Sequence, residues 1–170
     1  KPSSKRIFFM STKWLAAASV VLIAGLLIFW LTTKQSKYEK IYTVYFKPDP
    51  GLLAVMGNTE AYTFERAMVD YKEGNFEKAI ATWEQLRAIQ PNSDTLNYFL
   101  GVANLALQRD EKALTFLSPI SENKNSSFSK EACWYRGLIL IKKGLAEEGL
   151  EFVAKSNHPK RDDLLNELKQ

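Results

Sequence analysis

Gly74-Asn75-Phe76-Glu77-Lys78-Ala79-Ile80 is the stretch of sequence that indicates the fold. Related stretches begin at Gln108, 34 residues downstream, and at Gly144, after a further 36. Each combines a turn with the first apolar positions of a helix. A turn and helix that recur at about 34 residues are typical of a solenoid of helical hairpins. The sequence therefore predicts an all-α fold with three repeats, at about 60–91, 94–120 and 130–157.

Apolar periodicity around these turns predicts the individual helices, because residues three or four positions apart share one helix face. Phe64, Met68 and Tyr71 follow this spacing. The expected helices cover residues 60–74, 76–89, 94–107, 110–117, 130–143, 146–155 and 160–168. Pro119 is expected to end the fourth helix early. The helix at 160–168 is expected to cap the array, whose last repeat would otherwise expose an apolar face.

Residues 14–31 form an uncharged apolar stretch that begins with Trp14 and has Trp30 near its end. Eighteen helical residues span roughly 27 Å, close to the thickness of the hydrocarbon core of a bilayer. The stretch predicts a transmembrane helix that binds the lipid bilayer. A cleaved signal peptide and a buried core helix are the alternatives, but the stretch is long for a signal peptide and lacks an Ala-x-Ala site. The basic flank at 1–13 favours a cytoplasmic N-terminus.

Residues 32–57 are expected to form a juxtamembrane linker. Within it, the β-branched and aromatic residues 41–46 predict a short extended segment. Lys47-Pro48-Asp49-Pro50-Gly51 is then expected to interrupt any regular element.

The net charge of +4 is unevenly distributed along the chain. Residues 1–47 carry a net charge of +7, and residues 48–170 carry −3. The repeat region therefore lacks the basic stripe of a nucleic-acid-binding domain, and no nucleic-acid partner is expected.

The sequence gives little sign of catalytic or metal chemistry. Cys133 is the only cysteine and His158 the only histidine, which leaves no thiolate-rich or histidine-rich metal site. Cys133 is interpreted as a small buried residue and His158 as part of a turn before Pro159. We therefore expect no catalytic residues, no metal and no cofactor, and a chain that is not an enzyme.

The repeats resemble the tetratricopeptide repeat (TPR), a family of paired helices with small residues at the helix contacts. The residues that carry the resemblance are Ala67, Tyr71, Gly74, Phe76, Ala79, Trp83 and Pro91 in the first repeat; Leu100, Gly101, Ala103, Ala113 and Leu117 in the second; and Trp134, Gly137, Gly144, Gly149 and Leu150 in the third. The resemblance implies a right-handed superhelix over residues 58–169. The departures from the family pattern are Arg66-Ala67 in place of Leu-Gly in the first repeat, and Gly149 in place of Ala and the lack of a closing Pro in the third.

The whole chain is also similar to a group of bacterial inner-membrane repeat proteins. The similarity rests on an anchor, then Tyr45-Phe46-Lys47-Pro48-Asp49-Pro50, then three repeats. Some members of this group carry a cytoplasmic region similar to an anti-sigma domain before the anchor. The similarity implies a single-pass inner-membrane protein with its repeats in the periplasm.

The repeat array predicts a groove on its concave face, lined by the first helix of each hairpin and suited to a protein or peptide partner. The predicted lining residues are Phe64, Met68, Tyr71, Lys72, Tyr98, Val102, Leu105, Trp134, Leu138, Ile141 and Lys142. Each aromatic residue among them, taken singly, is more often a core residue than a ligand contact.

The function predicted from the sequence is a membrane-anchored scaffold for protein–protein interaction. A transmembrane signalling protein with an anti-sigma-like domain before Lys1 is the first alternative. A non-catalytic subunit of a cell-envelope assembly is the second. The sequence names neither the partner nor the oligomeric state.

Overall fold

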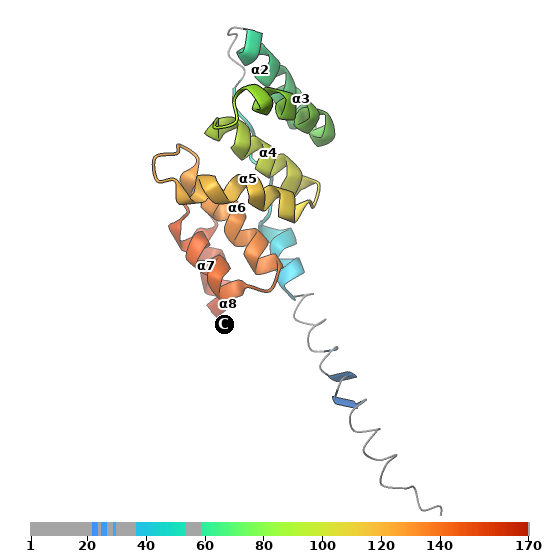
Figure 1. Ribbon diagram of the computed structural model, residues 1–170. Helices are drawn as coiled ribbons and strands as arrows, with labels where there is room; N and C mark the ends of the chain where they lie inside the picture. Colours follow the sequence, from blue (N-terminus) through green and yellow to red (C-terminus); the bar gives the residue numbers. More distant parts are fainter. Residues whose placement is uncertain (1–21, 24, 27–28, 30–36, 54–58, 170) are drawn as a thin grey trace, which may run out of the picture. The chain divides into compact units, whose positions relative to one another are not determined.

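The fold was analysed in a computed structural model, which describes residues 22–23, 25–26, 29, 37–53 and 59–169 (Figure 1). The chain forms two units, Lys1–Lys37 and Tyr38–Gln170. In the first unit, residues 22, 23, 25, 26 and 29 are helical and exposed. No helix in the described part of the chain has the length and apolar content needed to cross a membrane. The predicted basic flank at 1–13 and most of the predicted transmembrane helix at 14–31 lie outside the described residues.

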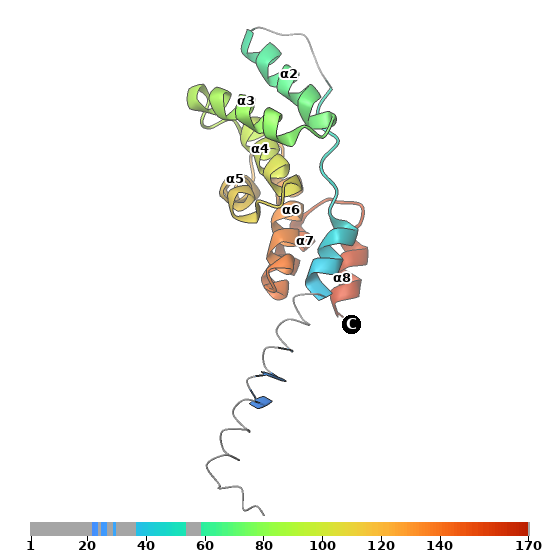
Figure 2. The same ribbon diagram turned by 90° about the vertical axis from the view of Figure 1, so that its right-hand side faces the viewer.

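The second unit is helical throughout its described secondary structure, which confirms the predicted all-α class for this part of the chain. After a helical stretch at residues 38–45, the helices are α2 (Thr59–Lys72), α3 (Phe76–Ile89), α4 (Asp94–Ala106), α5 (Asp110–Glu122), α6 (Ser129–Lys142), α7 (Ala146–Lys155) and α8 (Arg161–Lys169). Each helix from α2 to α7 packs against the next one in the chain (Figures 1 and 2).

The three predicted turns share one backbone geometry. Gly74, Gln108 and Gly144 have φ angles of 81°, 57° and 84°. At each turn the following residue donates its N–H to a carbonyl five positions earlier, as in Asn75 to Asp70. This is the hydrogen-bond pattern of a helix that ends in a left-handed residue. The repeated stretches therefore end α2, α4 and α6 in the same way.

Ion pairs recur between successive hairpins. Arg109 pairs with Glu77, and Lys143 pairs with Glu111. In each pair the two residues are 32 positions apart, so the contacts follow the repeat of the sequence. Such exposed pairs contribute at most about 1 kcal/mol each to stability. They link the turn of one hairpin to the second helix of the hairpin before it.

The core is continuous through the array and rich in aromatic rings. The rings of Phe64, Tyr71, Trp83 and Phe99 pack together, and the centroids of the contacting pairs are 5.6–6.3 Å apart. At the other end Leu164 of α8 is completely buried, which places the predicted capping helix on the third hairpin.

Two sequence predictions about local structure are wrong. The predicted extended segment at 41–46 is helical at residues 41–45, which belong to a helix at 38–45, and only Phe46 lies beyond it. Ile41, Tyr42 and Tyr45 are buried, and their helical spacing outweighs the β-propensity of this stretch. Pro119 does not end its helix either, and α5 continues to Glu122.

The continuation of α5 has a packing explanation. Ile120 and Ser121, which follow the proline, are both buried against neighbouring helices. Their burial offsets the hydrogen bond that the proline nitrogen cannot donate.

In the third hairpin α6 and α7 approach each other closely, with a glycine of each helix at the contact. A Cβ atom on Gly149 would lie 2.8 Å from the carbonyl oxygen of Gly137 and 2.7 Å from Cγ1 of Ile141. A Cβ atom on Gly137 would likewise lie 2.8 Å from the carbonyl oxygen of Gly149. The departure from Ala at Gly149 is therefore required by the backbone contact between α6 and α7.

Gly149→Ala is expected to destabilise the fold by about 1–3 kcal/mol, because the added methyl group overlaps backbone atoms that cannot easily move. The measurement is urea unfolding of the full chain in detergent, followed by circular dichroism. Ala154→Gly, at an exposed position of α7, is the control for helix propensity and should cost about 1 kcal/mol. A more stable Gly149→Ala variant would contradict the close contact.

Gln108→Gly is expected to stabilise the fold by about 1 kcal/mol, because glycine adopts the left-handed conformation without strain. The reverse change, Gly144→Gln, should destabilise it by a similar amount, since no atom would contact the added Cβ and only the backbone strain differs. Thermal unfolding of both variants tests the equivalence of the two turns. Shifts of the same sign in both variants would refute it.

Candidate functional site

The chain's own residues 38–51 lie against α2, α4 and α6, on the side where the sequence predicts the groove (Figure 2). We call residues 38–51 the docked segment. We call the surface that holds it the inner face, defined by Met68, Tyr71, Tyr98, Trp134, Tyr135 and Lys142. The segment begins with the helix at 38–45 and continues as irregular chain.

Three tyrosine hydroxyls, one from each of three helices, hold the irregular part. Tyr71 of α2 donates to the carbonyl oxygen of Asp49 at 2.7 Å. Tyr98 of α4 donates to Oδ2 of Asp49 at 2.9 Å. Tyr135 of α6 donates to the carbonyl oxygen of Lys47 at 2.9 Å. In these contacts the inner face donates and the docked segment accepts.

These hydroxyl groups remain protonated at neutral pH. Burial raises the pKa of Tyr71, Tyr98 and Tyr135 well above the ordinary value of 10.0. The nearby carboxylate of Asp49 raises each pKa further, because it disfavours a second negative charge. The inner face is therefore a fixed set of hydrogen-bond donors.

Gly51 ends the contact in a tight turn. Its N–H donates to Oδ1 of Asp49 at 2.8 Å, and its φ is 82°. A Cβ atom here would lie 2.7 Å from Sδ of Met68 and 3.0 Å from Cε of Lys72. The position thus favours glycine for its left-handed backbone conformation, and an added Cβ would also displace the ends of the Met68 and Lys72 side chains.

Aromatic packing holds the helical part of the docked segment. Phe46 stacks on Tyr42 at 5.0 Å and contacts the edge of Tyr135. Tyr45 contacts the ring of Trp134, and its hydroxyl donates to Glu167 of α8 at 2.8 Å.

A buried cation fixes the start of the docked segment. Nζ of Lys142 lies 2.9 Å from Oδ2 of Asp110 and 3.9 Å from Oε1 of Glu39. It also lies 4.6 Å from the centroid of the Tyr42 ring. The lysine side chain is only 11% exposed, so its charge is compensated by these neighbours rather than by bulk water.

The structure brings most of the predicted groove residues together, but as buried residues. Nine of the eleven are buried: Met68, Tyr71, Tyr98, Val102, Leu105, Trp134, Leu138, Ile141 and Lys142. Phe64 is half-buried, and Lys72 is exposed beside Gly51. Tyr71, Tyr98, Trp134 and Lys142 contact the docked segment directly.

The three aromatic residues predicted to be equivalent differ in role. Phe64 stacks on Trp83 inside the first hairpin. Tyr98 stacks on Phe128 while its hydroxyl reaches Asp49. Trp134 lies between His158, whose ring is stacked at 3.8 Å, and Tyr45 of the docked segment.

Sequence reasoning missed Tyr135, Asp49 and Gly51. The tyrosines occupy different positions relative to the repeat, since Tyr71 lies three residues before its turn and Tyr135 nine before. Alignment of the three repeats therefore does not place these tyrosines at equivalent positions. The one available signal was the Pro-Asp-Pro-Gly sequence, which was interpreted as a break between elements and as part of the similarity to bacterial inner-membrane repeat proteins, but not as a contact with the repeats.

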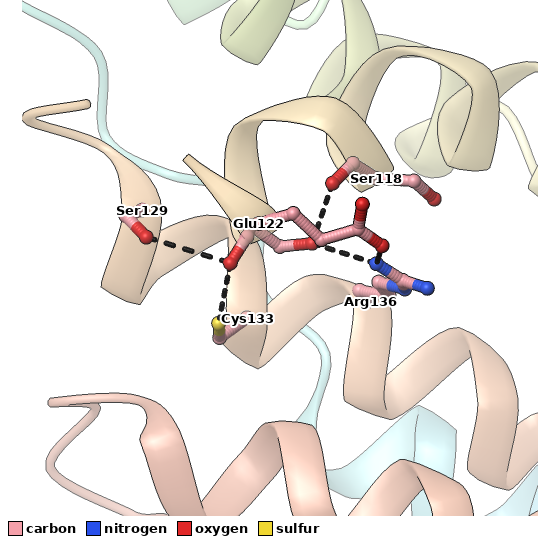
Figure 3. Close-up of polar contacts among 6 residues, drawn as sticks. Ser118, Glu122, Ser129, Cys133 and Arg136 are labelled. Atoms are coloured by element: carbon pink, nitrogen blue, oxygen red, sulfur yellow. Dashed lines mark hydrogen bonds and ion pairs between the residues drawn. The ribbon is translucent and has the colours of Figure 1, made fainter. Parts of the chain in front are cut away.

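A second polar cluster joins α5 to α6 (Figure 3). Ser129 and Cys133 both donate to the carbonyl oxygen of Ser121 at 3.5 Å, and Arg136 reaches Glu122 at 2.6 Å. The cluster borders an open hollow of about 690 Å³. Burial raises the pKa of the Cys133 thiol, so the thiolate is disfavoured. The Ser129 and Cys133 side chains satisfy a backbone carbonyl in the last turn of α5, so the cluster caps this helix.

His158 belongs to the turn before α8. Its Nδ1 accepts the N–H of Lys160 at 3.2 Å, and burial lowers its pKa. Among the described residues, no group of three or more His, Cys, Asp or Glu residues is placed to hold a metal ion.

Comparison of the chain with models of protein families, with curated proteins and with solved structures gives no match. The inner face is therefore interpreted from its own geometry.

Tyr98→Phe is expected to destabilise the full chain by about 1–2 kcal/mol, because Asp49 loses a hydrogen-bond donor while the ring and its packing remain. Urea unfolding measures the effect. The Gly51 N–H donates a hydrogen bond to the carboxylate of Asp49, and its hydrogen exchange should also become faster. Tyr62→Phe is the control, since the side chain of Tyr62 is 63% exposed on α2. Equal effects of the two variants would refute the role of the Tyr98 hydroxyl.

Proposed function

We propose that the chain is a membrane-anchored interaction module whose inner face binds an extended segment of a protein partner. In this proposal residues 14–31 are the anchor, with the N-terminus in the cytoplasm and the repeats in the periplasm. Residues 58–169 form a right-handed superhelix of TPR-like hairpins. The recurring turns, the ion pairs at a spacing of 32 residues and the stacked hairpins support the repeat assignment.

One observation carries the binding function: the inner face already holds a non-helical peptide segment. Buried tyrosine donors from α2 and α6 bind the backbone carbonyls of Asp49 and Lys47, and a third from α4 binds the carboxylate of Asp49. Contacts to backbone carbonyls recognise a chain in an extended form, whereas contacts between side chains alone would suit a packed core. The surface therefore has the chemistry of a peptide-binding site, occupied by a segment of the same chain.

A partner must compete with the docked segment for this surface. The apparent affinity for a partner falls in proportion to the fraction of molecules in which the surface is open. A change that weakens the docked segment without altering the inner face should therefore increase partner binding. Asp49→Ala is such a change, because the side chain of Asp49 belongs to the segment and contributes a hydrogen bond to Tyr98.

The test is photo-crosslinking in washed membranes of cells that express the full chain. A photoreactive amino acid at Lys72, which is exposed beside the docked segment, should give an adduct with a second protein, and Asp49→Ala should increase its yield several-fold. The same amino acid at Glu84, an exposed position on α3, is the control and should give no such increase. Absence of an adduct at Lys72 in both backgrounds, or equal adducts at both positions, would contradict the proposal.

A further inference from the structure

The docked segment shows which ligand chemistry the inner face recognises. Its contacts at residues 47–49 are all acceptors: two backbone carbonyls and one carboxylate oxygen. The surface opposite them supplies hydroxyl donors from α2, α4 and α6. A ligand for this surface must therefore present an acidic side chain between accepting carbonyls.

The two prolines suit the segment to a surface of donors. Pro48 and Pro50 have no N–H, so they bring no donor that would need an acceptor from the inner face. They also restrict Lys47 and Asp49, the residues before them, to extended conformations. These are the two residues whose carbonyls accept the tyrosine hydrogen bonds. The prolines thus pre-organise the accepting groups and lower the entropic cost of binding.

The ends of the ligand are defined as well. The ring of Phe46 packs edge-to-face with the ring of Tyr135. The ligand therefore has an aromatic residue two positions before its first proline, Pro48. Gly51 lies so close to Met68 that a Cβ atom would overlap Sδ. The recognised sequence is therefore aromatic, any residue, Pro, acidic, Pro, Gly.

The irregular part of the docked segment is placed to exchange while the helix at 38–45 stays. Lys47, Pro48 and Pro50 are exposed, so this part covers the surface without entering the core. The helix, in contrast, is anchored by buried Ile41 and Tyr42. Release of residues 46–51 alone would uncover the three tyrosine hydroxyls.

We propose that the inner face binds, in trans, extended partner segments of the form aromatic–x–Pro–acid–Pro–Gly, and that residues 46–51 are a built-in copy of this ligand. The proposal rests on the proposed function and names its partner class. The occupant is a segment of another protein, recognised by an acidic residue between two prolines.

The test is fluorescence anisotropy with a labelled peptide of residues 42–53 and the full chain in detergent micelles. Two chain variants weaken the docked segment by independent means: Asp49→Ala removes the carboxylate, and Gly51→Ala adds a clash with Met68 and backbone strain. Each should bind the peptide about tenfold more tightly than the wild-type chain does, because the internal competitor is weakened. Circular dichroism confirms that each variant retains its helices.

A double-mutant cycle tests the specificity for the acid. The peptide that carries Asp49→Ala should bind the Asp49→Ala chain about tenfold more weakly than the native peptide does. In the Asp49→Ala/Tyr98→Phe chain the two peptides should bind alike, because the hydroxyl that reads the carboxylate is absent. A purely structural role for Tyr98 would weaken both peptides equally.

Three results would overturn the inference. The first is unchanged peptide affinity in both the Asp49→Ala and the Gly51→Ala chains. The second is equal binding of the two peptides to the Asp49→Ala chain. The third is self-association of the wild-type chain that Asp49→Ala abolishes, which would identify a second copy as the occupant. If the peptide does not bind the variants but the photoreactive amino acid at Lys72 still gives an adduct that Asp49→Ala increases, this ligand class is rejected and the proposed function stands.

Discussion

The arrangement of the inner face depends on the convergence of three tyrosine hydroxyls on residues 47–49. In a stack of hairpins each unit contacts mainly its neighbours, so the first and third hairpins are joined mainly through the second. The docked segment contacts α2, α4 and α6 together, and Tyr45 extends this contact to Glu167, 122 residues away. One short segment therefore adds long-range connections to a fold built from local ones.

The buried Lys142 gives the docked segment its position along this surface. An ion pair at a buried site gains little stability over apolar packing, but an unpaired buried charge would cost about 3–5 kcal/mol. Displacement of the helix at 38–45 would remove Glu39 and the Tyr42 ring from the lysine, leaving Asp110 as its partner. Polar contacts at this end and tyrosine donors at the other thus select a single register for the segment.

Occupation by a segment of the same chain changes how the surface is understood. A free groove binds whatever ligand fits, whereas an occupied surface binds only ligands that outcompete the segment already present. In the proposed function the buried, protonated tyrosines supply the donors, and the extended chain that brings the better acceptors wins the competition. In this proposal, the geometry that completes the fold also defines the selectivity of the inner face.

The sequence by itself determined the hairpins, their turns and the capping helix, since these depend on local periodicity and on residues such as Gly74 and Gly144 that favour a left-handed turn. It also identified Tyr71, Tyr98, Trp134 and Lys142 as members of one face. Only the tertiary structure decided that the face is filled. The helix at 38–45 forms because burial of Ile41 and Tyr45 outweighs a local preference for extended chain, and α5 passes Pro119 for the same reason. Asp49 meets Tyr98 across 49 residues, and no local pattern of sequence encodes a contact that depends on the path of the chain between them.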